Sequence, residues 1–187
     1  VSKEKIKPTK RIEAKNMRLK LGLRSEKQRG GGPGNNCGMR KAKGDFHFRV
    51  NNDTEVTPNL IEALMNRLFT HASIGVTYPK IRYFYNPEVI QYAGFNPINN
   101  LTGRNTSVGN CEVDKGQHDT SNFTFSAHGC AMMLKKEVID KVGMFPEKFF
   151  IYYDEMDLSA RVLKAGYKIL YEPKGLIFHK ESMAMGK

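Results

Sequence analysis

The chain has 187 residues, of which 40% are hydrophobic and 26% charged, a composition typical of a globular protein and not of a disordered or collagen-like one. Its length fits one domain of ordinary size, and no stretch reaches the roughly 18 uninterrupted apolar residues that a membrane span requires. The formal net charge is +11, and a charge of this size is typical of proteins that bind nucleic acid or an anionic membrane.

The positive charge is concentrated at the N-terminal end. Residues 1–29 carry eleven Lys or Arg and three Glu, a net charge of +8, and residues 30–50 add +3. From residue 51 to residue 187 fifteen bases balance fifteen acids. Residues 1–29 contain no Phe, Tyr or Trp that could stack on bases, so we expect no nucleic-acid partner, and a basic nucleic-acid-binding module is kept as an alternative.

Three widely spaced cysteines, Cys37, Cys111 and Cys130, include no C-x-x-C pair. They indicate neither a disulfide framework nor a zinc site, and they fit a reducing compartment. The chain starts at Val1, so we expect either a processed chain or a fragment. These features predict a cytoplasmic protein, with a peripheral position at the cytoplasmic face of the membrane as an option because of the basic N-terminal end.

The first 43 residues divide into a basic segment, a strand, a glycine-rich loop and a helix. Residues 1–17 show no clean apolar period and are expected to be a basic arm or the remnant of a truncated segment. Residues 18–23 alternate basic and apolar side chains, as a strand does. Four glycines within residues 30–34 predict a flexible loop, and residues 35–43 predict a helix that ends at a glycine.

The middle of the chain alternates strand and helix patterns. Residues 45–50 read as a strand, and the polar run 51–55 follows directly, at the end of a strand where α/β sheets keep their chemistry. A Thr-Pro pair at 57–58 opens a helix with apolar residues at 3.6-residue spacing up to residue 69. Short strands are expected after it, at residues 73–77, 80–85 and 89–92.

Residues 95–122 are rich in Asn, Gly, Thr, Ser and Asp and lack a period, and so long a loop inside a domain is usually functional or mobile. Order is expected to resume at residues 124–134. Two helices that each end at a glycine and two closing strands follow, at residues 136–142, 155–165, 167–171 and 176–178. This alternation predicts an α/β or mixed-sheet sandwich.

Several segments together resemble a known family. They are residues 30–38 (GGGPGNNCG), 42–46 (AKGDF), 51–56 (NNDTEV), 128–132 (HGCAM), 142–145 (VGMF), 149–158 (FFIYYDEMDL) and 165–167 (AGY), with Arg161, Pro173, His179 and Lys180. In order and spacing they resemble family 2 glycosyltransferases, most nearly the rhamnosyltransferase-like branch, over residues 18–182. The strand and helix with which the family normally begins have no recognisable counterpart before residue 18.

The resemblance implies that residues 18–187 form a partial GT-A domain, a three-layer α/β/α sandwich with a mixed central sheet. It implies inverting transfer of a sugar, hexosyl or rhamnosyl, from a nucleotide-diphosphate donor of UDP or dTDP type to an acceptor hydroxyl, assisted by Mg²⁺ or Mn²⁺. The acceptor would be a glycan or a lipid-linked molecule in the synthesis of cell-surface polysaccharide. A catalytically silent binding domain with the same fold is the alternative.

The resemblance also assigns a metal site. Asp53 stands where the family has its metal-binding carboxylate, Glu55 is a candidate second ligand, and His179 matches a C-terminal histidine that can reach the metal or the diphosphate. Hard divalent cations are usually held by one or two carboxylates and the phosphates of the substrate. Without the family context, the interpretation of Asp53 is a helix or turn cap, and that of His179 is an ordinary surface or core residue.

Three acids, Asp154, Glu155 and Asp157, lie together at the start of a predicted helix. An acceptor hydroxyl must lose its proton as it attacks, so a general base has to lie beside it. By resemblance Glu155 is that base, with Asp154 as its competitor, and Asp157 is a structural acid that Arg161 can pair with one turn later. Acids at a helix N-terminus also favour the helix dipole without any catalytic role.

The roles of the remaining candidate site residues are implied by the resemblance alone. The glycine-rich loop lacks the spacing of a P-loop, and by resemblance it lies along the nucleotide. The expected donor-binding residues are Arg29, Gly30, Asn36, Asn52 and Asp53. The expected residues of the acceptor or sugar pocket are His128, Gly129 and Asp157. The alternative for His128 and Gly129 is a purely structural one, a glycine needed for packing with a histidine next to it.

Overall fold

The structure is a computed structural model that describes residues 31–99, 101–102, 104–149 and 153–180. The predicted donor-binding residues Arg29 and Gly30, the basic arm at residues 1–17 and the strand expected at residues 18–23 lie outside this part of the chain.

The described residues form a mixed sheet in which the strand order is β1-β6-β3-β7-β2. Only β3 and β7 are parallel among the strand pairs of this part of the chain; β4 pairs with β3 and β5 with β7, both antiparallel. The strands are β1 Phe46–Val50, β2 Thr54–Val56, β3 Ile74–Tyr83, β4 Ile90–Tyr92, β5 Asn122–Thr124, β6 Ala131–Lys135 and β7 Lys168–His179.

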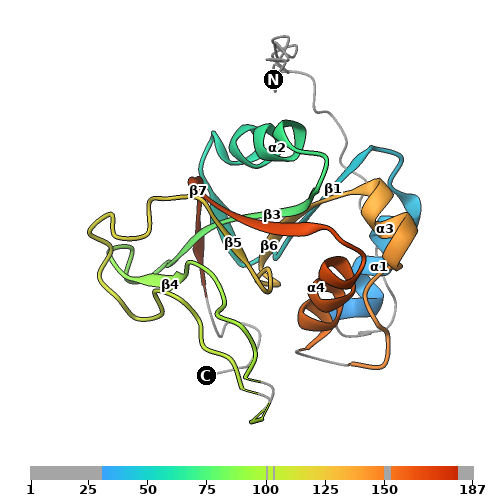
Figure 1. Cartoon of the computed structure of the whole chain (residues 1–187). Coiled ribbons are helices and arrows are strands. Elements are labelled where there is room, and N and C mark those ends of the chain that lie inside the picture. Colours follow the sequence, from blue (N-terminus) through green and yellow to red (C-terminus); the bar gives the residue numbers. More distant parts are fainter. Residues whose placement is uncertain (1–30, 100, 103, 150–152, 181–187) are drawn as a thin grey trace, which may run out of the picture.

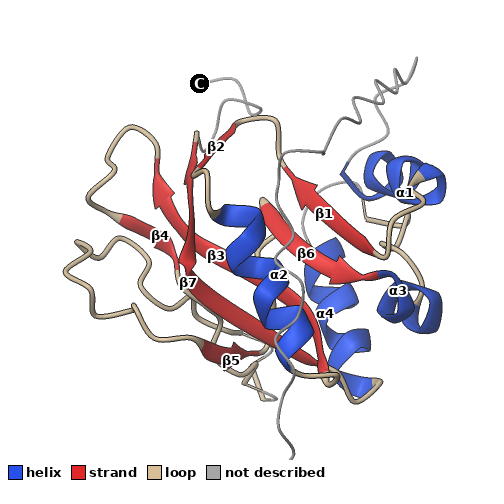
Figure 2. Ribbon diagram, turned by 90° about the horizontal axis from the view of Figure 1, so that it is seen from above, coloured by secondary structure: helices blue, strands red, loops and turns tan. Residues whose placement is uncertain are grey.

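Helices cover both faces of this sheet. They are α1 Gly31–Lys41, α2 Leu60–Thr70, α3 Lys136–Val142 and α4 Asp154–Lys164. In Figure 1, α2 lies above the sheet and α1 and α4 lie below it, and Figure 2 shows α2 across β3 and β7. The predicted three layers with a mixed central sheet are therefore confirmed.

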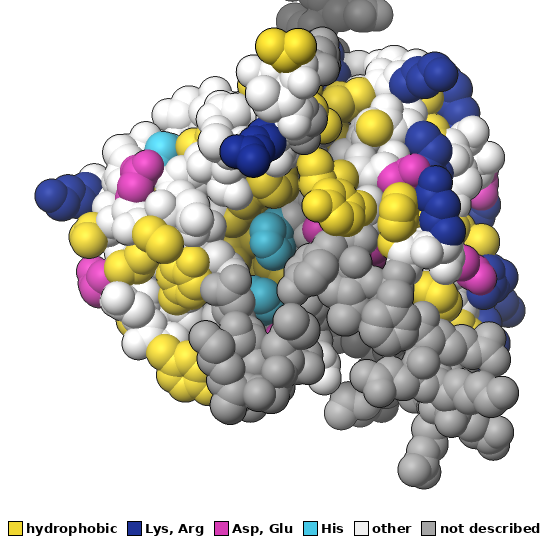
Figure 3. All heavy atoms as spheres, turned by 90° about the horizontal axis from the view of Figure 1, so that it is seen from below, with side chains coloured by type: hydrophobic (Ala, Val, Ile, Leu, Met, Phe, Trp, Pro, Cys, Tyr) yellow, Lys and Arg dark blue, Asp and Glu magenta, His cyan; other side chains and the backbone are white. Residues whose placement is uncertain are grey.

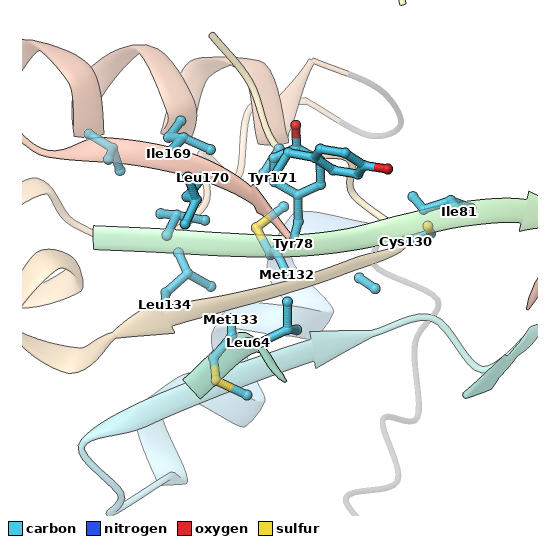
Figure 4. Close-up of a cluster of buried hydrophobic side chains, with 14 of the residues drawn as sticks. Leu64, Tyr78, Ile81, Cys130, Met132, Met133, Leu134, Ile169, Leu170 and Tyr171 are labelled. Atoms are coloured by element: carbon cyan, nitrogen blue, oxygen red, sulfur yellow. The ribbon is translucent and has the colours of Figure 1, made fainter. Parts of the chain in front are cut away.

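The core lies where β3 and β6 meet the helices. Leu60, Leu64 and Leu68 recur every fourth residue on one side of α2, and all three are buried. Strand β6 lies between β1 and β3, so both of its edges are paired, and its first four residues are apolar and buried. Figure 4 shows this cluster, in which Tyr78 and Tyr171 from neighbouring strands pack ring to ring, 5.6 Å between centroids.

The glycine-rich run is helical where it was expected to be a loop. Helix α1 already begins at Gly31 and ends at Lys41, so the loop prediction is wrong for residues 31–34. The helix is held by tertiary contacts. The side-chain amide of Asn36 donates to the carbonyl of Phe145 (2.8 Å) and accepts from its N–H (3.0 Å), and Gly32 lies so close that a Cβ would be 3.0 Å from the Pro146 carbonyl oxygen.

Other element boundaries differ in informative ways. The strands expected at residues 73–77 and 80–85 are one strand, β3, whose pairing with β7 shifts register between Pro79 and Lys80. The two closing strands are likewise one strand, β7, whereas within residues 124–134 only Thr124, at the end of β5, and residues 131–134 of β6 are in strands. Helix α2 starts later than predicted, at Leu60 after the cap residue Asn59, and the Thr57 hydroxyl donates to the Leu176 carbonyl (2.9 Å). Helix α3 matches its prediction, and no described helix is long and apolar enough to cross a membrane.

Candidate active site

Three segments that are distant in sequence meet at one end of the sheet. Val50, the last residue of β1, pairs with Ala131, the first residue of β6, so the turn after β1 lies beside His128 and Gly129. Thr54 of β2 pairs with His179, the last residue of β7. In Figure 3 histidine side chains lie together in a hollow of this face, bordered by hydrophobic side chains. The topology therefore gathers the predicted metal and pocket residues.

Asp53 and His179 form the centre of this group. Asp53 Oδ1 lies 3.4 Å from His179 Nε2 and is buried without a hydrogen-bond partner. The backbone holds the pair in place, because the N–H of Lys180 donates to the Asp53 carbonyl (2.8 Å). A buried, unpartnered carboxylate oxygen next to an imidazole nitrogen fits a divalent cation. No group of three or more His, Cys, Asp and Glu in the described residues could hold a metal, so substrate oxygens and water would complete its coordination.

The structure does not bring Glu55 to this pair. Glu55 is exposed and its Oε1 lies 3.1 Å from Lys180 Nζ. In β2 it follows Thr54, the residue opposite His179, and successive side chains of a strand point to opposite faces. Asn52, a predicted donor-binding residue, is exposed in the turn between β1 and Asp53.

The acidic cluster begins helix α4 and faces the turn before β6. A Cβ on Gly129 would lie 3.3 Å from Cδ of Glu155, so the glycine leaves room for that carboxyl group. Burial raises the pKa of Glu155 to about 7, and a hydrogen bond to the side chain of buried Asp154 adds to the shift, although the positive charge of Arg49 opposes it. A carboxyl with this pKa changes its protonation state near neutral pH, which suits a general base.

Arg49 lies in this cluster, although the sequence pattern does not mark it as a candidate site residue. It belongs to β1, where it alternates with apolar residues, and the sequence pattern assigns it no role beyond the strand. Its Cζ lies 4.8 Å from the centroid of the Phe145 ring, and its Nη2 lies 3.9 Å from Asp154 Oδ2. Its Nε and Nη1 are buried without hydrogen-bond partners in the described part of the chain. Burial lowers the pKa of Arg49, and the carboxylates of Asp154 and Glu155 act in the opposite direction. No local pattern in the sequence marks it.

His128 presents a defined hydrogen-bonding edge to the same hollow. Its ring lies 6.2 Å from the His179 ring and 4.9 Å from the Tyr92 ring, centroid to centroid. Burial lowers the pKa of His128 to about 3, and the positive charge of Arg49 acts in the same direction, so the ring is neutral at physiological pH. Its Nδ1 accepts from the N–H of Cys130 (3.1 Å). The ring proton therefore lies on Nε2, which can act as a donor.

Two further predicted residues have structural partners. The buried Asn36 amide is bound to Phe145, as described above, and also donates to Glu147 Oε1 (3.1 Å). Asp157 accepts from Arg161 Nε (2.7 Å), as the i, i+4 spacing predicts, and Arg161 also donates to the carbonyls of residues 142–144. The structure thus brings together Asp53, His179, His128, Gly129, Asp154 and Glu155.

Curated relatives cover the chain unequally. The N-acetylglucosaminyl-diphospho-decaprenol L-rhamnosyltransferase of Mycobacterium tuberculosis is 29% identical over 59 residues, which is 32% of this chain and 19% of that protein. An uncharacterized protein of Sinorhizobium fredii, y4gI, is 24% identical over 163 residues, covering 81% of this chain and 17% of that protein. The chain therefore spans less than a fifth of the length of these curated relatives.

Solved glycosyltransferase structures share the fold. GalNAc-T7 with UDP, GalNAc and Mn²⁺ matches 84% of this chain with a TM-score of 0.67 and 17% identity, over 31% of its own chain. The mannosyltransferase PcManGT of Pyrobaculum calidifontis with GDP-Man and Mn²⁺ matches 86% of this chain with a TM-score of 0.58 and 15% identity, over 39% of its own chain. The expected GT-A fold is confirmed.

The family model "Glycosyl transferase family 2" matches residues 8–143. The match contains Asp53, His128 and Gly129, and it ends before the acidic cluster of α4 and His179. Because this match covers well over half of the sequence, the chain belongs to glycosyl transferase family 2.

Proposed function

We propose that this chain transfers a sugar from a nucleoside-diphosphate donor to an acceptor hydroxyl, with inversion at the sugar carbon and Glu155 as general base. The observation that carries the proposal is the position of Glu155, which lies against Gly129 and next to Arg49. Its pKa of about 7 suits a general base. Membership of the family supports the donor class, as do the UDP and GalNAc bound in one structural neighbour and the GDP-Man bound in the other.

In this mechanism the Glu155 carboxylate takes the proton of the acceptor hydroxyl while the hydroxyl oxygen attacks the anomeric carbon. The bond from that carbon to the diphosphate breaks on the opposite side, which inverts the configuration. Burial keeps the Glu155 pKa high, and the side chain of Asp154, which is paired with Arg49, adds to this shift. The His128 Nε2–H is available to donate to a substrate oxygen.

Asp53 and His179 would hold Mg²⁺ or Mn²⁺, because their facing atoms offer one carboxylate oxygen and one imidazole nitrogen. When bound, such a cation offsets the negative charge that grows on the leaving diphosphate. Mn²⁺ in both structural neighbours supports this assignment.

The acceptor, the pathway and the location are also part of the proposal. We infer a glycan or lipid-linked acceptor in cell-surface polysaccharide synthesis, reached from the cytoplasmic face of the membrane. The support is the relative from M. tuberculosis, whose name states a diphospho-decaprenol-linked sugar, together with the basic residues 1–29 of this chain. UDP and dTDP sugars are the expected donors.

The test is Glu155→Gln, assayed by release of nucleotide from UDP- and dTDP-sugars and by binding of UDP in the presence of Mn²⁺. We expect transfer to fall by about 10²-fold or more, the usual contribution of a general base, while UDP binding stays the same. Because the base must be deprotonated, the wild-type rate should decline about tenfold for each pH unit below the Glu155 pKa of about 7.

The matched control is Glu137→Gln, which removes an exposed acid from the first turn of α3. This substitution changes the interaction with the helix dipole as Glu155→Gln does, but it lies outside the candidate site. Loss of UDP binding in Glu155→Gln would contradict a role as base. If the wild-type chain binds UDP with Mn²⁺ but transfers no sugar from any donor, the catalytically silent domain is the correct assignment.

A further inference from the structure

His179 has contacts on both ring nitrogens. Its Nδ1 lies 2.9 Å from Oε1 of Gln91, a buried residue in the middle of β4. Its Nε2 faces Asp53 Oδ1 at 3.4 Å, and that oxygen has no hydrogen-bond donor in the described part of the chain. Together the two contacts restrict the position of the imidazole proton.

An amide oxygen only accepts hydrogen bonds, so the contact with Gln91 requires the proton of a neutral His179 ring to be on Nδ1. The lone pair is then on Nε2 and faces the carboxylate oxygen of Asp53 without a proton between them. Two such electron pairs repel each other unless a metal cation or a second ring proton lies between them. Their separation is close to the roughly 3 Å between neighbouring ligand atoms around an octahedral Mg²⁺.

His128 gives the opposite arrangement on the same face. Its Nδ1 accepts the N–H of Cys130, so its proton is on Nε2. The two neighbouring rings, 6.2 Å apart, therefore differ in tautomer: His128 offers a proton, and His179 offers a lone pair. The partner of His128 is backbone, whereas the partner of His179 is a side chain that can be replaced by mutation.

We propose that Gln91 is a positioning residue of the metal site, whose Oε1 keeps the His179 proton on Nδ1 and so leaves the Nε2 lone pair free for the cation beside Asp53. This inference rests on the metal assignment made above and adds a residue to it. Partners of this kind fix the ring orientation and tautomer of metal-binding histidines. Gln91 has no sequence motif that reveals the role.

The first experiment needs no metal. Nitrogen-15 NMR of histidine-labelled, metal-free protein at mildly alkaline pH distinguishes protonated from unprotonated ring nitrogens, and His179→Asn and His128→Asn assign the signals. We expect unprotonated Nε2 in His179 and unprotonated Nδ1 in His128. In Gln91→Leu, the His179 signals should change to a mixture of tautomers, whereas Gln91→Glu, which keeps an acceptor oxygen, should retain the Nδ1–H form.

The second experiment measures Mn²⁺ binding by electron paramagnetic resonance of the free ion. Gln91→Leu should weaken binding about 10- to 100-fold, the usual effect of removing such a partner, and Gln91→Glu should not weaken it. Gln117→Leu, which removes an exposed glutamine from the loop after β4, is the matched control and should bind Mn²⁺ like the wild type.

The outcomes separate this inference from the function on which it rests. A wild-type His179 with its proton on Nε2 would overturn the role of Gln91, as would a Gln91→Leu variant that binds Mn²⁺ as tightly as the wild type. If the wild-type protein binds no Mn²⁺ while the His179 tautomer is the expected one, the metal assignment fails and the influence of Gln91 on the ring stands.

Discussion

At the level of single residues, Gly129 determines how closely the charged groups of the site approach one another. A Cβ at this position would lie 3.0 Å from Arg49 Nη1 and 3.3 Å from Glu155 Cδ, and Arg49 is itself in contact with the Phe145 ring and Asp154. The sequence-based alternative of a plain packing glycine is therefore incomplete, since what packs on Gly129 is the proposed catalytic carboxyl and its positive neighbour.

Gly129→Ala should destabilise the fold by about 1–3 kcal/mol, because the added methyl group must displace Arg49 or Glu155. The control is Gly38→Ala in α1, where nothing lies within 4 Å of the added Cβ, and it should stabilise the protein by about 0.5–1 kcal/mol. Chemical denaturation measures both. Equal effects of the two substitutions would contradict the close approach described here.

The sequence predicted candidate site residues only where residue type and position along the chain are enough to suggest their chemistry. Asp53, Glu155 and His179 were expected because carboxylates and histidines at element ends match a family pattern, and the structure gathers them. Arg49 and Gln91 were not expected, because a base in an alternating strand and an amide in a short strand look like ordinary residues. Their roles depend on partners that come from other segments, Asp154 for one and His179 for the other.

At the level of elements, the long loop after β4 is tied to the sheet by a buried ion pair. Lys80 Nζ in β3 lies 2.8 Å from Asp114 Oδ2, and the two side chains are 3% and 1% exposed. Arg82 donates to the same oxygen from its Nε at 2.9 Å, and the Tyr171 hydroxyl donates to the His118 carbonyl (3.0 Å). The composition of the loop at residues 95–122 predicted a functional or mobile segment. These contacts show that the second half of the loop is anchored to the sheet.

Asp114→Ala should cost about 3–5 kcal/mol, because Lys80 is left buried without this partner. Burial alone would raise the pKa of Asp114, but hydrogen bonds from Lys80, the Gly116 backbone and Arg82 bring it down to about 2. The wild type should therefore lose about 2 kcal/mol of stability as the pH falls from about 4 to 2, and the variant should lack this loss. Urea denaturation at several pH values measures it.

The control for this prediction is Asp119→Ala, since Asp119 contacts the same Lys80 but its side chain is 63% exposed. Its loss should cost less than about 1 kcal/mol, as for other exposed ion pairs. If both substitutions cost the same, the buried pair does not anchor the loop.

Element prediction succeeded where local signals suffice and failed where distant contacts decide. Helix α3 was predicted to the residue because its apolar period ends at Gly143, which has a positive φ of 82°. Helix α1 was not, since no local rule favours a helix through Gly-Gly-Pro-Gly, and the bonds of Asn36 to Phe145 cross more than a hundred residues. Strands β3 and β7 are continuous because they pair with each other, which neither segment reveals alone.

At the level of the whole molecule, the net charge of +11 is a property of one end of the chain. We predict that this end increases affinity for anionic surfaces and is not required for metal binding. Replacing Lys3, Lys5, Lys7, Lys10 and Lys15 by Gln should weaken binding to phosphatidylserine vesicles at least tenfold, since each lysine near such a surface contributes about 1 kcal/mol. Mn²⁺ binding should be unchanged.

The matched control replaces five exposed lysines of the charge-balanced part, Lys115, Lys136, Lys148, Lys164 and Lys174. It changes the net charge equally and should affect vesicle sedimentation less. Equal losses from both sets would mean that only the total charge matters. Steeply salt-dependent binding to DNA that the first set abolishes would instead favour the nucleic-acid alternative.

The tyrosine cluster of the core has an optical consequence. The chain has eight Tyr and no Trp, so its near-ultraviolet absorbance and fluorescence come mainly from tyrosine. Burial raises the pKa of Tyr78, of Tyr92 and of Tyr171 above the usual value, and the Tyr92 and Tyr171 rings each lie within 6 Å of the Tyr78 ring. These phenols stay protonated in alkali for as long as the core is closed. Their ionisation thus provides an intrinsic, label-free signal of unfolding.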